Sequence, residues 1–118
     1  MLPRAQRLRR DRDFRAVYSR AKVVSTPCLS LHVRRFPGRT RIPARFGFVI
    51  SKKVAKRAHD RNRLKRRLRE ICRLELLPRL APGAPVDAFF VARAPVLALP
   101  FARLVAEVET LSRQAGLL

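Results

Sequence analysis

Residues 52–73, KKVAKRAHDRNRLKRRLREICR, constrain the fold more than any other stretch because they are both strongly basic and amphipathic. The stretch contains eleven Lys or Arg residues and only two acidic residues, Asp60 and Glu70. Its second half also repeats apolar residues at the spacing of one helix face: Leu64, Leu68, Ile71 and Cys72. This combination predicts a structured element that binds a polyanion, and it argues against a disordered basic tail.

The helix within this stretch is predicted to cover residues 61–77. Asp60 is the expected N-cap, because its carboxylate can accept hydrogen bonds from the first free amides of a helix. Pro78, followed by a Pro-Gly pair, is expected to end the helix. Residues 52–59 show no clear period and are expected to form a connecting turn.

The positive charge of the chain is concentrated in its first part. The net charge is +20 over 118 residues. Residues 1–73 hold 24 basic and 4 acidic residues, whereas residues 74–118 hold 4 of each. Such a charge opposes folding through self-repulsion and is typical of a protein that binds nucleic acid or an anionic membrane. Nucleic acid is the expected partner, and a generally basic surface is the alternative.

The length and composition are those of a single domain over residues 1–118 with one modest core and a basic arm over residues 1–10. Cys28 and Cys72 lack a CxxC spacing, so we expect free thiols in or near the core and no zinc site or disulfide framework. There is no long apolar run and no apolar signal region. The expected location is the cytoplasm, without a membrane partner.

The first part of the chain predicts one helix and two strands. Asp11 or Asp13 can begin a helix whose apolar face is Phe14, Val17, Tyr18 and Ala21. Residues 28–35 alternate as a half-buried strand, and residues 45–51 do so more strongly. The loop between them contains Pro-Gly and is expected to be a hairpin connection. Residues 22–27 are expected to be a connection or a short edge strand.

The last part predicts a buried strand over residues 86–93 and a closing helix from Phe101 to a stop at Gly116. The predicted order is therefore helix, strand, strand, helix, strand, helix. This order is an α+β fold with helices packed on a small mixed sheet. We expect the hairpin strands to be antiparallel and the last strand, after a helical crossover, to lie parallel to one of them.

Two features of the predicted sheet face leave alternatives open. Gly47 lies inside a strand, which indicates close approach of a ligand or partner to the backbone, or else a bulge or tight sheet packing. Phe14 and Tyr18 are expected to dock the first helix on the sheet. Their aromatic faces can also stack on unpaired bases, as in proteins that bind single strands.

The sequence offers little for catalysis by the polypeptide itself. It has two histidines, His32 and His59, and no HxxxH, Walker or GxGxxG motif. Its one DxD, Asp11 and Asp13, lies among arginines at a predicted helix start, where capping residues belong. No residue is assigned as catalytic and none as a metal ligand. A chain of this kind is expected to bind RNA or DNA without breaking bonds itself.

One run of the sequence resembles the signature of the bacterial ribonuclease P protein subunit. This run is SKKVAKRAHDRNRLKRRLRE, with RNR at residues 61–63. The flanking segments also resemble the family. Its first helix is similar to RLRRDRDFRAVY, its central strand to RFGFVISKK, and its last strand to VDAFFVAR. One departure is Ala21-Lys22, where the family often has a glycine before a basic residue. A basic ribosomal or general RNA-binding protein is the alternative.

The resemblance implies a protein subunit of a ribonucleoprotein endonuclease that removes the 5′ leader of precursor tRNA. In the family, the RNA subunit carries the active site and its required Mg²⁺, and the protein binds no small-molecule ligand. The family's β-α-β crossover is left-handed, contrary to the general rule. The implied partners are the catalytic RNA and precursor tRNA.

The resemblance also implies two binding surfaces. The set implied to bind the catalytic RNA, called the basic face below, is Lys52, Lys53, Lys56, Arg57, Arg61, Asn62, Arg63, Lys65, Arg66 and Arg69. The set implied to bind the single-stranded leader, between the first helix and the sheet, is Arg7, Leu8, Phe14, Tyr18 and Arg45.

Overall fold

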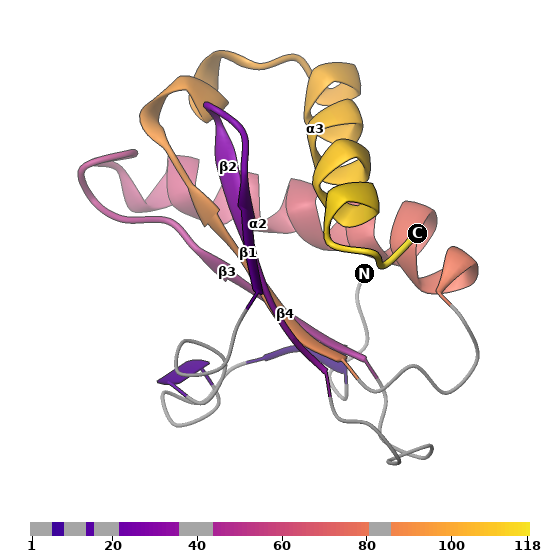
Figure 1. The fold of residues 1–118 in the computed structure, drawn as a ribbon. Coiled ribbons are helices and arrows are strands. Elements are labelled where there is room, and N and C mark those ends of the chain that lie inside the picture. The colour runs from indigo at the N-terminus through magenta and orange to yellow at the C-terminus, as the bar shows by residue number, and fades with distance from the viewer. Residues whose placement is uncertain (1–5, 9–13, 16–21, 36–43, 81–85) are drawn as a thin grey trace.

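A computed structural model describes residues 6–8, 14–15, 22–35, 44–80 and 86–118. The described chain forms one four-stranded sheet with the helices α2 (Ala58–Ile71) and α3 (Phe101–Gln114) on the same face (Figure 1). The predicted basic arm, most of the predicted first helix including Tyr18, and the loop at residues 36–43 lie outside the described residues. The α+β class is confirmed.

The sheet contains β1 (Lys22–Ser25), β2 (Leu29–Arg35), β3 (Arg45–Val49) and β4 (Val86–Ala92) in the order β1-β2-β4-β3. β1 shows that the edge-strand alternative for residues 22–27 is correct. β4 runs parallel to β3, as predicted for the strand after the helical crossover, and antiparallel to β2.

The predicted hairpin between the second and third strands is wrong, because β4 lies between them. The reason is visible in β4 itself. Six of its seven residues are buried, since VDAFFVA is apolar on both sides, and such a strand suits the centre of a sheet. Local alternation in the two flanking strands carries no information about which strand will separate them.

The main core lies between the sheet and the two helices. The predicted core face of α2 is confirmed, because Leu64, Leu68 and Ile71 are buried. Across from them, β2 contributes Leu29, Leu31 and Val33, β4 contributes Phe90, and β3 contributes Phe46. Both cysteines are free and buried, as predicted.

The bounds of the basic helix differ from the prediction. Arg57, not Asp60, is the N-cap, and Asp60 lies inside the first turn, where its charge still favours the helix dipole. The α-helix ends at Ile71 and continues as a π-helical turn, Cys72–Leu76, and a 3-10 turn, Leu77–Arg79. Pro78 has no amide hydrogen, so a regular helix cannot extend through it.

The closing helix follows the prediction. α3 begins at Phe101 after a 3-10 segment, Ala94–Ala98, and ends before Gly116, which has a φ of 77°. Glycine adopts this left-handed conformation without a Cβ clash. None of the helices in the described ranges is long and apolar enough to cross a membrane.

Candidate nucleic-acid interface

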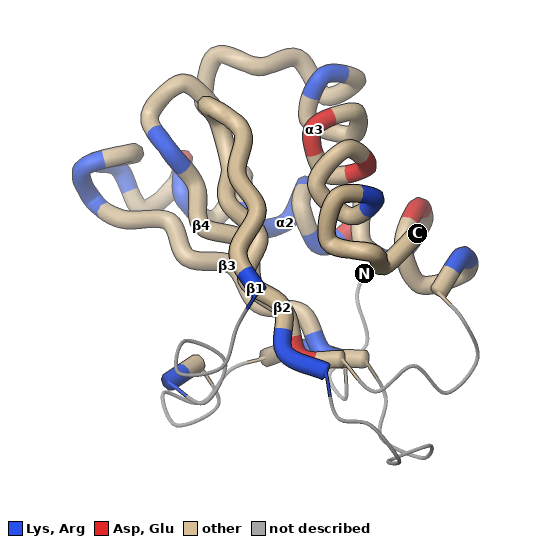
Figure 2. The backbone as a smooth tube through the Cα atoms, in the orientation of Figure 1, with Lys and Arg blue, Asp and Glu red and all other residues tan. Residues whose placement is uncertain are grey.

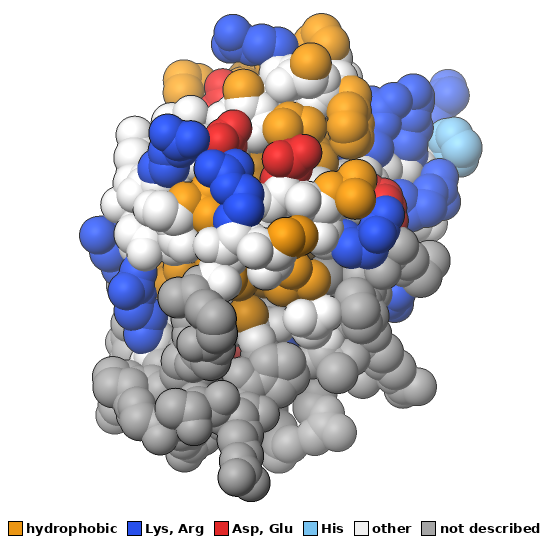
Figure 3. Space-filling model, turned by 90° about the vertical axis from the view of Figure 1, so that its right-hand side faces the viewer, with side chains coloured by type: hydrophobic (Ala, Val, Ile, Leu, Met, Phe, Trp, Pro, Cys, Tyr) orange, Lys and Arg blue, Asp and Glu red, His pale blue; other side chains and the backbone are white. Residues whose placement is uncertain are grey.

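The basic face lies on one helix and the segment that leads into it. The tube view shows Lys and Arg along α2 and the turn before it, whereas α3 carries both Glu and Arg (Figure 2). Seen from the side of α3, basic side chains gather along the right-hand edge, and basic, acidic and apolar side chains are mixed across the middle (Figure 3). The residues that the resemblance assigned to the catalytic RNA therefore lie on α2 and on the segment that leads into it.

Arg61 forms hydrogen bonds with the backbone of residues 52–57, the segment that contains the other cations before α2. Its Nη1 donates to the carbonyl oxygens of Ala55 at 2.8 Å and Lys56 at 2.9 Å. These bonds hold the segment against the start of α2, so Arg61 positions Lys56 and Arg57. The periodicity of the helix gives no signal for such a bond, because it joins a helix side chain to an irregular loop.

A second feature is a groove beside β3, called the β3 groove below. The amide of Leu8 donates to the carbonyl oxygen of Phe46 at 2.7 Å, which places the segment before the predicted first helix alongside this strand. The cavity has a volume of about 240 Å³. Its lining residues are Arg7, Leu8, Phe14, Phe46, Gly47, Phe48, Lys65 and Arg69.

Gly47 makes the packing of this groove possible. A Cβ atom at Gly47 would lie 2.5 Å from Cζ of Phe14 and 3.1 Å from Cβ of Leu8, which is too close for the first contact. Of the alternatives for Gly47, the structure therefore shows tight packing, because the groups that lie over its backbone are the chain's own Phe14 and Leu8. The absence of a side chain keeps the Phe14 ring at the groove.

Phe14 docks on the sheet and still lines the groove. Its ring centroid lies 5.2 Å from that of Phe89 at an interplanar angle of 55°, and Phe89 in turn stacks on His32 at 4.5 Å. Burial lowers the pKa of His32 from its usual value, which favours the neutral imidazole. Because Phe14 is only half-buried, the structure supports docking and leaves part of the ring exposed.

Three cationic side chains surround the β3 groove: Arg7, Lys65 and Arg69. Burial lowers the pKa of Arg69, and the charge of Arg7 lowers it further. This mutual repulsion would be relieved by an anion such as a phosphate. Lys65 and Arg69 were assigned to the catalytic RNA by resemblance, so α2 contributes to both predicted surfaces, which the sequence did not indicate.

Arg45 has a different environment from the other predicted leader residues. Its Nε donates to Oδ1 of Asp87 at 2.8 Å, and its Nη2 donates to Oδ2 at 2.5 Å. The Asp87 side chain is 4% exposed and that of Arg45 is 30% exposed. Arg45 is not among the described residues that line the β3 groove. Its contact with the leader stays a prediction.

The end of the basic stretch is neutralised by a local pair. Arg73 Nη2 donates to Oε2 of Glu70 at 2.9 Å. The hydrogen bonds from Arg73 are the main cause that lowers the pKa of Glu70 to about 2. Among the described residues, no three His, Cys, Asp or Glu side chains gather closely enough to hold a metal ion.

Comparisons with known proteins identify the family and the fold of the chain. Residues 2–116 match the family model described as Ribonuclease P. The chain is 42% identical to the ribonuclease P protein component of Synechococcus sp., covering 100% of this chain and 87% of the relative. It is 45% identical to that of Chloroflexus aurantiacus, covering 98% and 81%.

Solved structures show the same fold. The RNase P protein of Staphylococcus aureus superposes with a TM-score of 0.81 at 20% identity, covering 95% of this chain and 96% of that chain. The RNase P protein of Thermotoga maritima superposes with a TM-score of 0.77 at 23% identity, covering 92% and 96%.

The sequence match runs through the basic helix and the strand beside the groove, and the fold match includes the sheet that positions both. The partner of such a protein is the ribonuclease P RNA. The chain therefore belongs to the ribonuclease P protein family, the protein subunits of an endoribonuclease that processes tRNA.

Proposed function

We propose that this subunit binds the catalytic RNA through the basic face and holds the 5′ leader of precursor tRNA in the β3 groove. In this proposal, the RNA subunit and its Mg²⁺ ions perform the cleavage. The protein contributes by binding and positioning the two RNAs, so that the leader is cut where the mature tRNA begins.

The observation that carries the proposal is the composition of the β3 groove. Its apolar wall contains Phe14 and Phe48, and its cationic side chains are Arg7, Lys65 and Arg69. Proteins that bind single strands combine an aromatic surface for bases with cations for the backbone. A leader is single-stranded, so its unpaired bases are accessible to such a surface.

The basic face suits a folded RNA rather than a single base sequence. Its exposed members include Lys52, Lys53, Lys56, Arg63 and Arg66, and they follow the surface of α2 and the turn before it. Arginine forks and lysine ammonium groups bind phosphates, which every RNA presents along its backbone. Contacts of this type fix the orientation of two molecules.

Reconstitution tests the proposal directly. The purified chain, the ribonuclease P RNA and both together are incubated with precursor tRNA at physiological salt and limiting Mg²⁺. We expect the chain alone to leave the leader intact and to increase cleavage when the RNA is present. The chain can be treated with nuclease, and the nuclease inactivated, before precursor tRNA is added. Cleavage of the leader by this treated chain would overturn the proposal, as would no effect of the chain on cleavage by the RNA.

Replacement of Arg66 by Ala is expected to weaken binding of the catalytic RNA and to reduce its salt dependence. Each lost phosphate contact removes about 0.7–0.9 from the slope of log K against log salt. Filter binding at several salt concentrations measures this slope. Arg103→Ala is the control, because Arg103 is an exposed arginine of α3. Equal slopes for the two variants would contradict the assignment of Arg66.

Replacement of Phe14 by Ala is expected to weaken binding of precursor tRNA by roughly tenfold and to leave binding of mature tRNA unchanged. Stacking of a base on an aromatic ring contributes on the order of 1–3 kcal/mol. Both affinities are measured with the reconstituted holoenzyme. The control is Phe101→Ala, which removes a phenylalanine ring that is 46% exposed on α3. An equal loss for both tRNAs would show that Phe14 does not contact the leader, and a thermal melt separates this from unfolding.

A further inference from the structure

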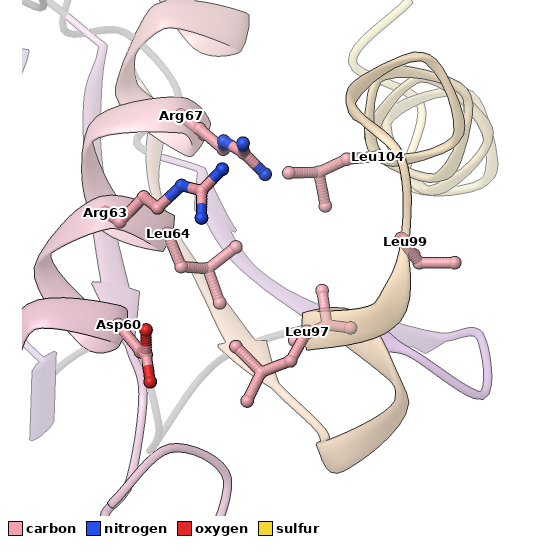
Figure 4. Close-up of a pocket in the computed structure, with 8 residues that line it drawn as sticks. Asp60, Arg63, Leu64, Arg67, Leu97, Leu99 and Leu104 are labelled. Carbon is pink, nitrogen blue, oxygen red and sulfur yellow. The ribbon is translucent and has the colours of Figure 1, made fainter. Parts of the chain in front are cut away.

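A second cavity lies on the other side of α2, between its first turns and the segment that leads into α3 (Figure 4). It has a volume of about 250 Å³ and is called the Leu97 groove below. From α2 come the side chains of Asp60, Arg63 and Arg67. From the facing segment come Leu97 and Leu99.

The floor of the Leu97 groove is part of the core, whereas its rim is open. Leu64 and Leu104 line the cavity and are only 5% and 1% exposed. Leu97 is 45% exposed, and Leu99 is half-buried. A flat apolar wall that remains in contact with water is thus held beside a charged helix. Apolar surface in a concave site is expected to bind a partner that buries it.

The charged side of the Leu97 groove lacks internal compensation. Arg63 and Arg67 are one turn apart on α2, and Figure 4 shows both side chains extending from the helix toward the facing segment. Within the described part of the chain, the side chains of Asp60, Arg63 and Arg67 form no hydrogen bond or ion pair. Other arginines are paired, as Arg73 is with Glu70 and Arg79 with Glu109.

We infer that the Leu97 groove binds one unpaired nucleotide of the ribonuclease P RNA, with its base against Leu97. This inference rests on the proposed function, because it extends the RNA-binding surface beyond α2. The phosphate would lie on Arg63 and Arg67, whose guanidinium groups bind phosphates in forked geometry. A volume of about 250 Å³ is below the ~300–1,000 Å³ of sites for larger ligands, so it suits a single base.

Asp60 adds a preference for the base. An ionised carboxylate only accepts hydrogen bonds, so it can bind an exocyclic amino group and not a carbonyl oxygen. Adenine, cytosine and guanine carry such a group, whereas uracil offers only its ring N3–H, which lies between two carbonyl oxygens that repel a carboxylate. We therefore expect uracil to bind more weakly than these three bases. Asp60→Asn, which can also donate, should relax the preference against uracil.

The test compares two leucines of similar exposure on different surfaces. Leu97→Ala shortens the wall of the groove, whereas Leu74→Ala changes a leucine that is 53% exposed and does not line it. We expect Leu97→Ala to weaken binding of the RNA subunit by about five- to tenfold, since an apolar contact is lost. The slope of log K against log salt should stay the same, because no phosphate contact is lost. Arg67→Ala should reduce both affinity and slope.

Chemical probing of the bound RNA locates the nucleotide. In the complex with the original chain, one unpaired A, C or G should be protected from base modification, and the Leu97→Ala complex should lose this protection. The Leu74→Ala complex should keep it. Thermal melts of the free chains are expected to agree among all three, so that the differences report binding.

The outcomes separate this inference from the proposed function. If the original chain shows no salt-dependent binding of the RNA, the proposed function fails, and the inference fails with it. If that binding is normal but Leu97→Ala behaves as Leu74→Ala in affinity and protection, only the inference is overturned. The latter result is also the one expected if an acidic peptide, rather than RNA, occupies the groove.

Discussion

Leu68→Ala is expected to destabilise the protein by about 2–5 kcal/mol, the range measured when a buried leucine is truncated to leave a cavity. Leu68 is 0% exposed and lies on the core face of α2. Single domains have a free energy of unfolding of only about 5–15 kcal/mol. A net charge of +20 further opposes the folded state through self-repulsion. The loss is therefore a large part of the total stability.

Urea denaturation measures this effect. The midpoint should fall while the slope m stays constant, because the surface exposed on unfolding is nearly unchanged. Leu74→Ala, a change at an exposed leucine, should alter stability by less than about 0.5 kcal/mol. Addition of the RNA subunit should raise the midpoint of Leu68→Ala, since a ligand that binds only the folded state stabilises it. A midpoint equal to that of Leu74→Ala would contradict the assignment of Leu68 to the core.

Arg45→Ala is expected to have the second large effect, a loss of about 3 kcal/mol in stability. The change leaves the carboxylate of Asp87 buried without its bidentate partner, and broken buried pairs cost about 3–5 kcal/mol. The lower end applies because Arg45 itself is partly exposed. Arg34 also lies opposite Asp87 in the pairing of β2 with β4, which keeps a second cation on the neighbouring strand.

The double variant Arg45→Ala/Asp87→Ala tests both this explanation and the predicted role of Arg45. Because it removes the stranded carboxylate, it should be more stable than Arg45→Ala alone, as measured by urea denaturation. Precursor tRNA binding then separates two roles. If Arg45 also contacts the leader, the double variant regains stability but not affinity. If stability and affinity for precursor tRNA are both restored, Arg45 acts only by pairing with Asp87. No gain in stability would contradict the ion-pair explanation.

The two grooves share one helix, which has a functional consequence. Lys65 and Arg69 line the β3 groove, whereas Arg63 and Arg67 line the Leu97 groove. Residues four apart along a helix point in similar directions, and residues two apart do not. α2 therefore presents cations to two sides while its leucines face the core. Under the proposed function and the inference about the Leu97 groove together, α2 would contact the leader through Lys65 and Arg69 and an unpaired nucleotide of the catalytic RNA through Arg63 and Arg67.

The sequence by itself determined the features that depend on local spacing. The core face of α2 followed from apolar residues at i, i+4 and i+7, and Gly116 was correctly predicted as the end of α3. β2 and β3 were predicted because residues of alternating polarity lie on opposite faces of a strand, and β4 was predicted because it is apolar on both faces. The charge of the first 73 residues predicted a nucleic-acid partner, and the resemblance carried by the RNR stretch and its flanks indicated the family, which is confirmed.

Only the tertiary structure decided the features that depend on contacts between distant segments. β4 lies between β2 and β3, Phe14 packs over Gly47, and Arg45 pairs with Asp87, 42 residues away. The local sequence pattern does not encode these pairings, because each one depends on which distant elements pack together when the chain folds. The basic stretch at residues 52–73 is the clearest case. Its periodicity distinguished the buried residues of α2 from the exposed ones, but only the packing of neighbouring segments on α2 formed two separate grooves.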